Sequence, residues 1–245
     1  MAADLTGPVV SDVLRIVSRT RTRVSDALRA AGDATWTAAV RHPMVRAIGD
    51  GTLPHETFRG YFEQNVLYLR DYVRAIAIVV SKAPDTGSMR TLTRFLTRIC
   101  DEEIPANLRF LERLGGDVDR AAHAGVPEMH PTTYAYTRHL LATCALGDRA
   151  EGLTAVLPCQ WSYGELARPL MASRPADPIY ADWISMFGDD DYDALVEAST
   201  DLLDLLVGSD EARLAALRPI FERSVRYEVE FWDMAYASGS SRRET

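Results

Sequence analysis

The stretch YFEQNVLYLRDY, residues 61–72, carries an aromatic stripe with the spacing of an α-helix. Its polar and aromatic members recur at i, i+4, i+7 and i+11 and so share one helical face: Tyr61, Asn65, Tyr68 and Tyr72. Such a face suits two roles, a core stripe whose hydroxyls find partners inside the protein, or the wall of a pocket for a flat, polar ring. The stripe alone leaves both roles open.

Helical patterns continue on both sides of this stretch, and no run alternates apolar and polar residues long enough to predict a strand. We expect a long helix from Pro54 to about Lys82. Pro43 interrupts an earlier helical segment, and Pro105 predicts a kink or break in a later one. The remaining expected helices cover residues 89–114, 133–146, 150–172, 178–187, 193–207 and 211 onward. The sequence therefore predicts an all-α protein of roughly eight helices.

Composition narrows the class of protein. The 245 residues are 47% hydrophobic and 25% charged, which is ordinary for a soluble globular protein with a sizeable core. The net charge of -8 argues against a nucleic-acid partner. No apolar run reaches the roughly 18 residues of a membrane span, and the N-terminus lacks the apolar segment of a signal peptide. The three cysteines show no CxxC pairing, which favours a reducing cytosol over a disulfide framework or a zinc site. We expect a cytoplasmic protein without membrane or nucleic-acid partners.

The chain divides into three expected parts. Residues 1–30 are an amphipathic N-terminal extension with a basic bias, residues 31–238 form one helical domain, and residues 239–245 are a disordered tail. The basic bias leaves open a nucleic-acid or membrane contact. Because acidic residues dilute it and the rest of the chain is acidic, a solvated helix face or a flexible extension is the favoured interpretation.

Two places could carry chemistry. Cys159 lies in VLPCQWSYGE, residues 156–165, with Tyr163 one helical turn later on the same face. This thiol is either a nucleophile helped by a nearby phenol or a buried cysteine acting as a small apolar side chain. Glu228 lies four residues before Trp232 on an apolar, aromatic face, where desolvation would raise its proton affinity. It is either a general acid/base or the structural partner of an arginine.

A metal site finds little support. Helical di-iron bundles use Glu-x-x-His pairs, and none of the five histidines has an acidic residue three positions before it. Asp101, Glu102 and Glu103 cluster, but the residue one turn after Glu103 is Asn107. We therefore predict neither a metal nor another cofactor.

Several runs together resemble one family. They are HPMVRAIGDGTLPHETFRGYFEQNVLYLRDYVRA (residues 42–75), followed in order by PTTYAYTRHL, LPCQWSYGELA, DPIYADWISMFG and YEVEFWDMAY. They are similar to the signatures of the TenA/thiaminase II family, over about residues 34–238. The resemblance implies a haem-oxygenase-like, single-domain helical bundle, without implying haem, and a homotetramer.

The resemblance also implies a reaction. A cysteine, here Cys159, attacks the pyrimidine ring of thiamin or of a degraded aminopyrimidine. A glutamate, here Glu228, moves protons, and water releases hydroxymethylpyrimidine. Tyr68 and Tyr163 correspond to phenols near the ring and the thiol.

Two positions depart from the family pattern. Asn65 replaces an aspartate that contacts the amino edge of the ring, and it can accept a hydrogen bond but cannot take a proton. Phe187 replaces a tyrosine near the site. Three hypotheses follow: a hydrolase of the salvage type, a diverged enzyme acting on another amine or heterocycle, or a non-catalytic ligand-binding relative.

Overall fold

The computed structural model describes residues 23–123, 125 and 128–241. This part of the chain contains twelve α-helices, one π-helical turn and no strand, so the all-α prediction is confirmed. In chain order the elements are α2 (Val24–Ala31), α3 (Asp33–Val40), α4 (Pro43–Gly49), α5 (His55–Ser81), α6 (Thr86–Arg98), η1 (Ile99–Glu103), α7 (Ile104–Arg113), α8 (Val118–His123), α9 (Pro131–Leu146), α10 (Arg149–Leu170), α11 (Pro178–Gly188), α12 (Asp190–Val207) and α13 (Glu211–Ser241). None of these helices is long and apolar enough to cross a membrane.

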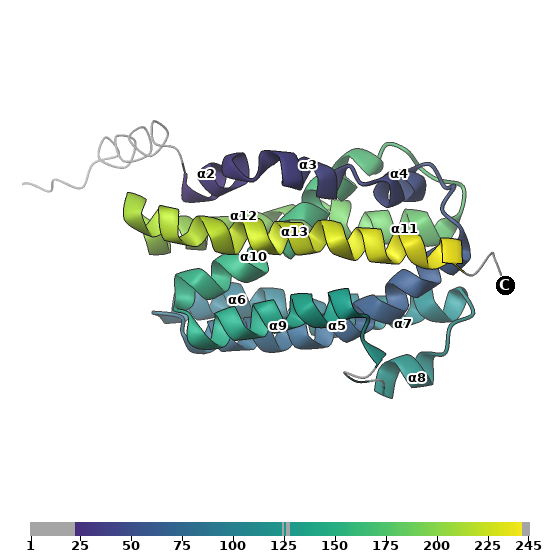
Figure 1. Cartoon of the computed structure of the whole chain (residues 1–245), viewed down its shortest axis with the longest axis horizontal. Helices are drawn as coiled ribbons and strands as arrows, with labels where there is room; N and C mark the ends of the chain where they lie inside the picture. Colours follow the sequence, from purple (N-terminus) through teal and green to yellow (C-terminus); the bar gives the residue numbers. More distant parts are fainter. Residues whose placement is uncertain (1–22, 124, 126–127, 242–245) are drawn as a thin grey trace, which may run out of the picture.

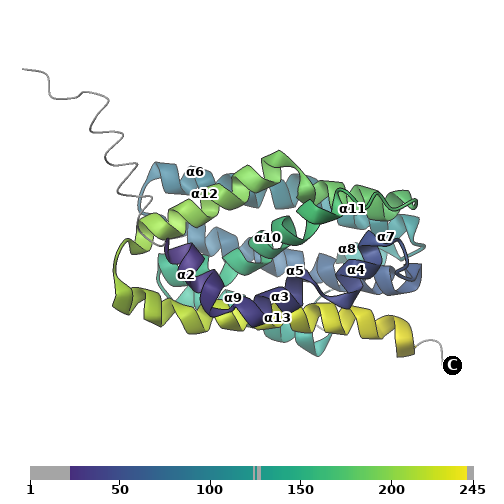
Figure 2. The same ribbon diagram turned by 90° about the horizontal axis from the view of Figure 1, so that it is seen from above.

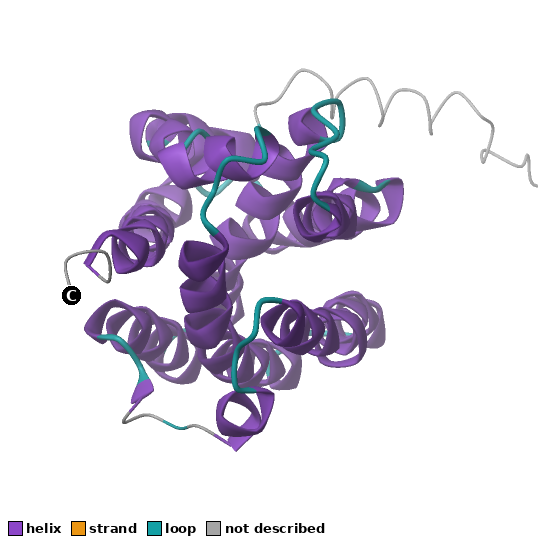
Figure 3. Cartoon of the chain, turned by 90° about the vertical axis from the view of Figure 1, so that its right-hand side faces the viewer, coloured by secondary structure: helices purple, strands orange, loops and turns teal. Residues whose placement is uncertain are grey.

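The helices form two layers with α10 crossing between them. In Figure 1, α2, α3, α4, α11, α12 and α13 lie above, while α5 to α9 lie below. Figure 3, along the long axis, shows one steep helix passing between the two groups. Helix α10 packs against α13, α11 and α12 on one side and against α9 and α5 on the other. Seen from above, it runs obliquely between α12 and the α3–α13 pair (Figure 2). A residue on α10 can therefore face the centre of the bundle or its surface.

Helix α5 is the main support of the lower layer, and the opening stretch lies in its middle. It packs against α9, α13, α7, α6 and α10. Because other helices cover it on many sides, α5 buries apolar and aromatic residues around most of its circumference, as expected for a central helix. These residues are Phe58, Tyr61, Phe62, Val66, Leu67, Tyr68, Leu69, Tyr72, Ala75, Ile76 and Val79.

The structure contains more helices than the roughly eight predicted, for local reasons. The segment over 34–48 is two helices, because the side chain of His42 caps α4 by accepting from the backbone N–H of Met44 at 3.1 Å and Pro43 begins the new helix. The segment over 89–114 breaks into α6 and α7 at the π-helical turn η1, just before Pro105. Helix α8 was not predicted.

Both ends of the chain differ from the predicted division. Helix α2 crosses the expected boundary at residue 30 and packs against α12 and α13. Arg23, part of the basic bias, pairs with Asp201 and Asp204 of α12, while residues 1–22 of the predicted extension lie outside the described residues. At the other end, the backbone of residues 239–241 continues α13, and residues 242–245, in the expected disordered tail, are not described.

Candidate active site

Cys159 lies on the part of α10 that crosses the bundle. The helix begins with a capping box in which Asp148 accepts from the backbone N–H of Glu151 at 3.0 Å and Glu151 reaches back to the Asp148 N–H at 2.8 Å. Pro158, inside the helix, supplies no N–H donor immediately before Cys159. The neighbours of Cys159 along the helix are largely buried, whereas Cys159 itself keeps part of its surface accessible.

Glu228 approaches Cys159 from α13. Its side chain is buried, and its carboxylate accepts a hydrogen bond from the hydroxyl of Tyr136 on α9 and interacts with the Cys159 thiol. Burial raises the pKa of Glu228 to about 7, although the bonds from Tyr136 and Cys159 favour the charged form. No arginine pairs with Glu228 among the described residues, so the structure disfavours the alternative of a structural ion pair.

The thiol of Cys159 is surrounded by groups that hold it neutral. Burial raises its pKa well above the ordinary value, and the nearby Glu228 carboxylate raises it further. The hydroxyls of Tyr68 and Tyr72 lie on the α5 side of the thiol and act in the opposite direction. The Tyr72 hydroxyl donates to the Val156 carbonyl at 2.7 Å. That of Tyr68 is buried and lies near the thiol, yet it makes no hydrogen bond of good geometry in the described structure.

Aromatic rings enclose the other side of the site. Tyr163 packs edge-on against Phe187 with 4.9 Å between ring centroids, and its hydroxyl lies 2.9 Å from that of Tyr61. The Tyr61 ring in turn stacks on Trp232 at 5.4 Å with 4° between the planes. Tyr163 is thus near Cys159, while its hydroxyl bonds to Tyr61.

The predicted site residue Asn65 bonds to helix α7. It is buried on α5, one turn before Tyr68, and its amide nitrogen donates to Asn107 Oδ1 on α7 at 2.9 Å. The structure therefore brings Cys159, Glu228 and Tyr68 together, and Asn65 lies one helical turn from Tyr68 on α5.

These helices match a known family. A model of the TENA/THI-4/PQQC family matches residues 29–238. The chain belongs to this family. The resemblance inferred from the sequence runs is therefore confirmed.

Individual relatives agree in fold and length. An aminopyrimidine aminohydrolase of Halalkalibacterium halodurans is 34% identical over 204 residues, covering 82% of this chain and 90% of that protein. A TenA homologue from P. horikoshii OT3 superposes with a TM-score of 0.80 and 30% identity, covering 89% of this chain and 100% of that one. A domain of unknown function with a heme oxygenase-like fold, from Shewanella denitrificans OS217, superposes with a TM-score of 0.68 at 13% identity and covers 89% and 94% of the two chains. The haem-oxygenase-like fold is therefore confirmed.

Two residues that the sequence analysis did not select also face this family site. Tyr136 bonds to Glu228, and its only signal in the sequence was its place in the run PTTYAYTRHL. Glu103, in the π-helical turn, interacts electrostatically with Cys159 and with Tyr61. Burial raises the pKa of Glu103 to about 7, partly offset by Arg98. The sequence pattern indicates Glu103 only as a candidate metal ligand, because no pattern in it predicts the π turn that carries this carboxyl group toward the site.

Among the described residues, no group of three or more histidine, cysteine, aspartate or glutamate side chains could hold a metal ion. The three cysteines are free thiols.

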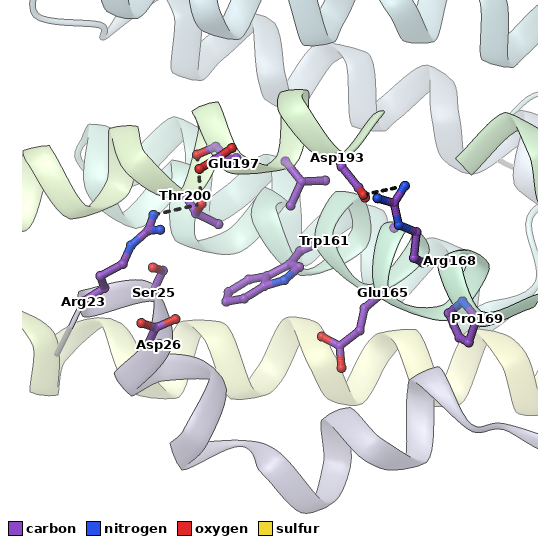
Figure 4. Close-up of a pocket in the computed structure, with 12 residues that line it drawn as sticks. Arg23, Ser25, Asp26, Trp161, Glu165, Arg168, Pro169, Asp193, Glu197 and Thr200 are labelled. Atoms are coloured by element: carbon purple, nitrogen blue, oxygen red, sulfur yellow. Dashed lines mark hydrogen bonds and ion pairs between the residues drawn. The ribbon is translucent and has the colours of Figure 1, made fainter. Parts of the chain in front are cut away.

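An open groove lies on the opposite face of α10 from Cys159. It has a volume of about 530 Å³ and lies between α2, α10 and α12 (Figure 4). Trp161 forms its floor, and Arg23 and Arg168 at its two ends pair with acidic residues of α12. Its lining includes neither Cys159 nor Glu228, so it is a surface feature separate from the candidate active site.

Proposed function

We propose that this protein is an aminopyrimidine hydrolase of the thiaminase II type, releasing hydroxymethylpyrimidine from thiamin or from its aminopyrimidine degradation products. One observation carries the proposal: a thiol and a buried carboxyl, Cys159 and Glu228, interact at the centre of the bundle between tyrosines. The similarity to a protein named aminopyrimidine aminohydrolase supports it.

The pair can move one proton back and forth. Glu228 takes the thiol proton, and the thiolate adds to an electron-poor carbon of the pyrimidine, whose ring nitrogen takes up a proton. The amine or thiazole leaves the exocyclic methylene carbon with the electrons of the broken C–N bond. Water then gives its hydroxyl to that carbon, and its remaining proton goes to the departing amine or, when the leaving group is the neutral thiazole, to solvent. Finally the sulfur leaves the ring, the ring nitrogen loses its extra proton, and the thiol regains its own from Glu228.

The electrostatics suit such a cycle at neutral pH. A carboxyl with a pKa of about 7 accepts and returns a proton with little cost near that pH. The raised pKa of Cys159 keeps the free enzyme in the unreactive thiol form. In this proposal Tyr68, Tyr163 and Phe187 flank the substrate ring, and the unpartnered Tyr68 hydroxyl is available to it.

A second candidate function is a diverged enzyme acting on another amine or heterocycle. The observation that favours it is the loss of a charged acceptor at Asn65 together with the loss of a hydroxyl at Phe187. Both changes make the contact with the ring less polar without removing the cysteine or the glutamate.

We propose in addition that the protein works in the cytoplasm and as a homotetramer. The cytoplasmic location rests on the free thiols of the protein. The homotetramer rests on the family resemblance and on large apolar side chains at the surface, such as Leu146 and Leu205. Light scattering after size-exclusion chromatography measures the mass directly, and a monomer would contradict the tetramer.

One assay decides between the two candidate functions. The purified protein is incubated with thiamin and, separately, with 4-amino-5-aminomethyl-2-methylpyrimidine, and hydroxymethylpyrimidine is quantified by chromatography. Release from either substrate supports the hydrolase. A folded protein that converts neither substrate refutes the hydrolase and leaves the diverged enzyme and the non-catalytic ligand-binding relative.

A further inference from the structure

A chain of side-chain amide groups runs from the π-helical turn η1 to Asn65, beside Tyr68 of the candidate active site. In η1 the hydrogen-bonding pattern changes just before α7. The side chain of Asn107, one turn later, donates through Nδ2 to the backbone carbonyl of Glu103 at 2.8 Å. Asn107 is completely buried, so this bond is shielded from water.

The carbonyl of Glu103 fixes the direction of the whole chain. A carbonyl oxygen can only accept, so the Asn107 atom facing it must be the amide nitrogen. The Asn107 oxygen therefore faces the other way, toward Asn65, and lies 2.9 Å from Asn65 Nδ2. Asn65 must present its nitrogen to Asn107, and its own oxygen, Oδ1, is turned away from α7.

The oxygen of Asn65 is thus left for something outside the amide chain. Among the described residues no hydrogen bond to Asn65 Oδ1 is found, and Asn65 as a whole is 3% exposed. One turn later on the same face of α5, the Tyr68 hydroxyl is also buried and unpartnered. Buried polar groups are nearly always satisfied in folded proteins, so a buried hydroxyl without a bond of good geometry, one turn from the open acceptor of Asn65, fits a place for a ligand.

We propose that Asn107 is a positioning residue that makes Asn65 a hydrogen-bond acceptor, so that the site selects a ring carrying an N–H donor at this edge. The inference rests on the proposed function for the identity of the ring as an aminopyrimidine. Asn65 is a neutral acceptor, and it suits an uncharged amino group. Asn107 acts through Asn65 and does not itself contact the substrate.

The inference is tested by comparing two ligands across three proteins. The ligands are 4-amino-5-hydroxymethyl-2-methylpyrimidine and its 4-methoxy analogue, which lacks the N–H donor. Their affinities are measured by isothermal titration calorimetry. We expect the wild type to prefer the amino compound about tenfold, the effect of one good hydrogen bond.

Asn107→Ser is the decisive variant. A helical serine can bond to the carbonyl four residues earlier, so it satisfies Glu103 while releasing Asn65. We expect the preference to fall toward equal affinity. Asn107→Asp is the matched control, because its buried carboxyl in the protonated form donates to the Glu103 carbonyl while its other oxygen still accepts from Asn65, which should preserve the preference. A full preference in Asn107→Ser, a lost preference in Asn107→Asp, or no preference in the wild type overturns the inference. Circular dichroism of both variants confirms folding.

The outcome for the proposed function is separate. If the protein prefers the amino compound and the preference depends on Asn107, but no substrate is hydrolysed, only the proposed hydrolase is refuted. If the substrate is hydrolysed but the preference for the amino compound does not change in the Asn107→Ser variant, only the positioning role of Asn107 is refuted.

Discussion

The two faces of α10 hold carboxylates in opposite ways. On the surface groove, Glu165 pairs with Arg29 at 3.1 Å and Asp193 pairs with Arg168 at 3.0 Å, all within reach of water. On the inner face, Glu228 meets a tyrosine and a cysteine, and burial raises its pKa to about 7. The two faces of α10 thus lie against carboxylates that hold a charge and against a carboxyl, supplied by α13, that binds its proton more tightly. The comparison shows that the groups around a carboxyl decide its charge and its proton affinity, and that its position in a groove does not.

The strongest test of the inner face is removal of its thiol. Cys159→Ala should lower turnover by about 10³-fold or more, because it removes the thiol proposed to attack the ring, while ring binding stays near the wild-type value. Turnover is measured as the release of hydroxymethylpyrimidine, and ring binding is measured by calorimetry. The exposed Cys100 provides the matched control, since Cys100→Ala should remain active. An active Cys159→Ala protein would remove the nucleophile assignment.

The second test changes the proton balance of Glu228. Its pKa is raised from 4.5 to about 7 on folding, so the unfolded chain loses this proton first as pH rises. The wild type should therefore lose stability between pH 4.5 and 7, by an amount on the order of 3 kcal/mol from this group above pH 7. Glu228→Gln cannot ionise and should be the more stable protein at pH 8, with little difference at pH 4.

Urea unfolding at the two pH values measures this difference. Glu103 contributes in the same direction, because its pKa is also raised to about 7, so the comparison must be between wild type and variant at each pH. Equal differences at pH 4 and pH 8 would show that Glu228 is not desolvated. Turnover of Glu228→Gln should fall by about 10²–10⁴-fold if it moves the proton.

The third test concerns the amide chain at the edge of the site. Asn65→Asp would place a carboxylate oxygen against the Asn107 oxygen, so we expect a loss of about 1–3 kcal/mol of unfolding free energy at neutral pH. Adding Asn107→Ser should recover much of it, because the opposing oxygen is removed. A double-mutant cycle by urea unfolding gives the coupling. Additive effects would contradict the geometry, and a gain of hydrolysis in Asn65→Asp alone would mark residue 65 as the point of divergence.

The smallest effect is expected on the surface groove. Glu165→Gln breaks the ion pair with Arg29, and because the pair is partly exposed it should cost less than about 1 kcal/mol. The cost should shrink in high salt and leave turnover unchanged. A larger loss, or any loss of turnover, would show that the two faces of α10 are coupled.

The sequence predicted the helices well because their apolar spacing is strong. The stripe of Tyr61, Asn65, Tyr68 and Tyr72 left core and pocket open, and the structure divides it between the two roles. Tyr72 finds a carbonyl partner, as a core residue should, whereas Tyr68 remains unpartnered beside the thiol. Such a division depends on what other helices bring to each position, and periodicity within one helix cannot contain it.

The parts of the site that were missed share one cause. Tyr136 and Glu103 come from α9 and η1, far in sequence from Cys159 and Glu228. Glu103 in particular depends on a local change of helical pitch. Pro105 predicted a disturbance of the helix, but a proline can produce a kink, a break or a π turn, and only the last places Glu103 and Asn107 as they are found.

The π turn makes the site depend on the length of the chain as well as on its residues. η1 accommodates more residues per turn than the α-helices on either side. Deleting one residue there, such as the exposed Cys100, would remove the π turn and leave α7 facing nearly as it does now, because a π turn absorbs about one extra residue. Keeping every residue while giving η1 the pitch of an α-helix would instead rotate α7 by about the 100° of one residue relative to α6. Asn107 would then leave Asn65 and Glu103 would leave the thiol, so a protein with its helix content intact would have lost one wall of its binding site.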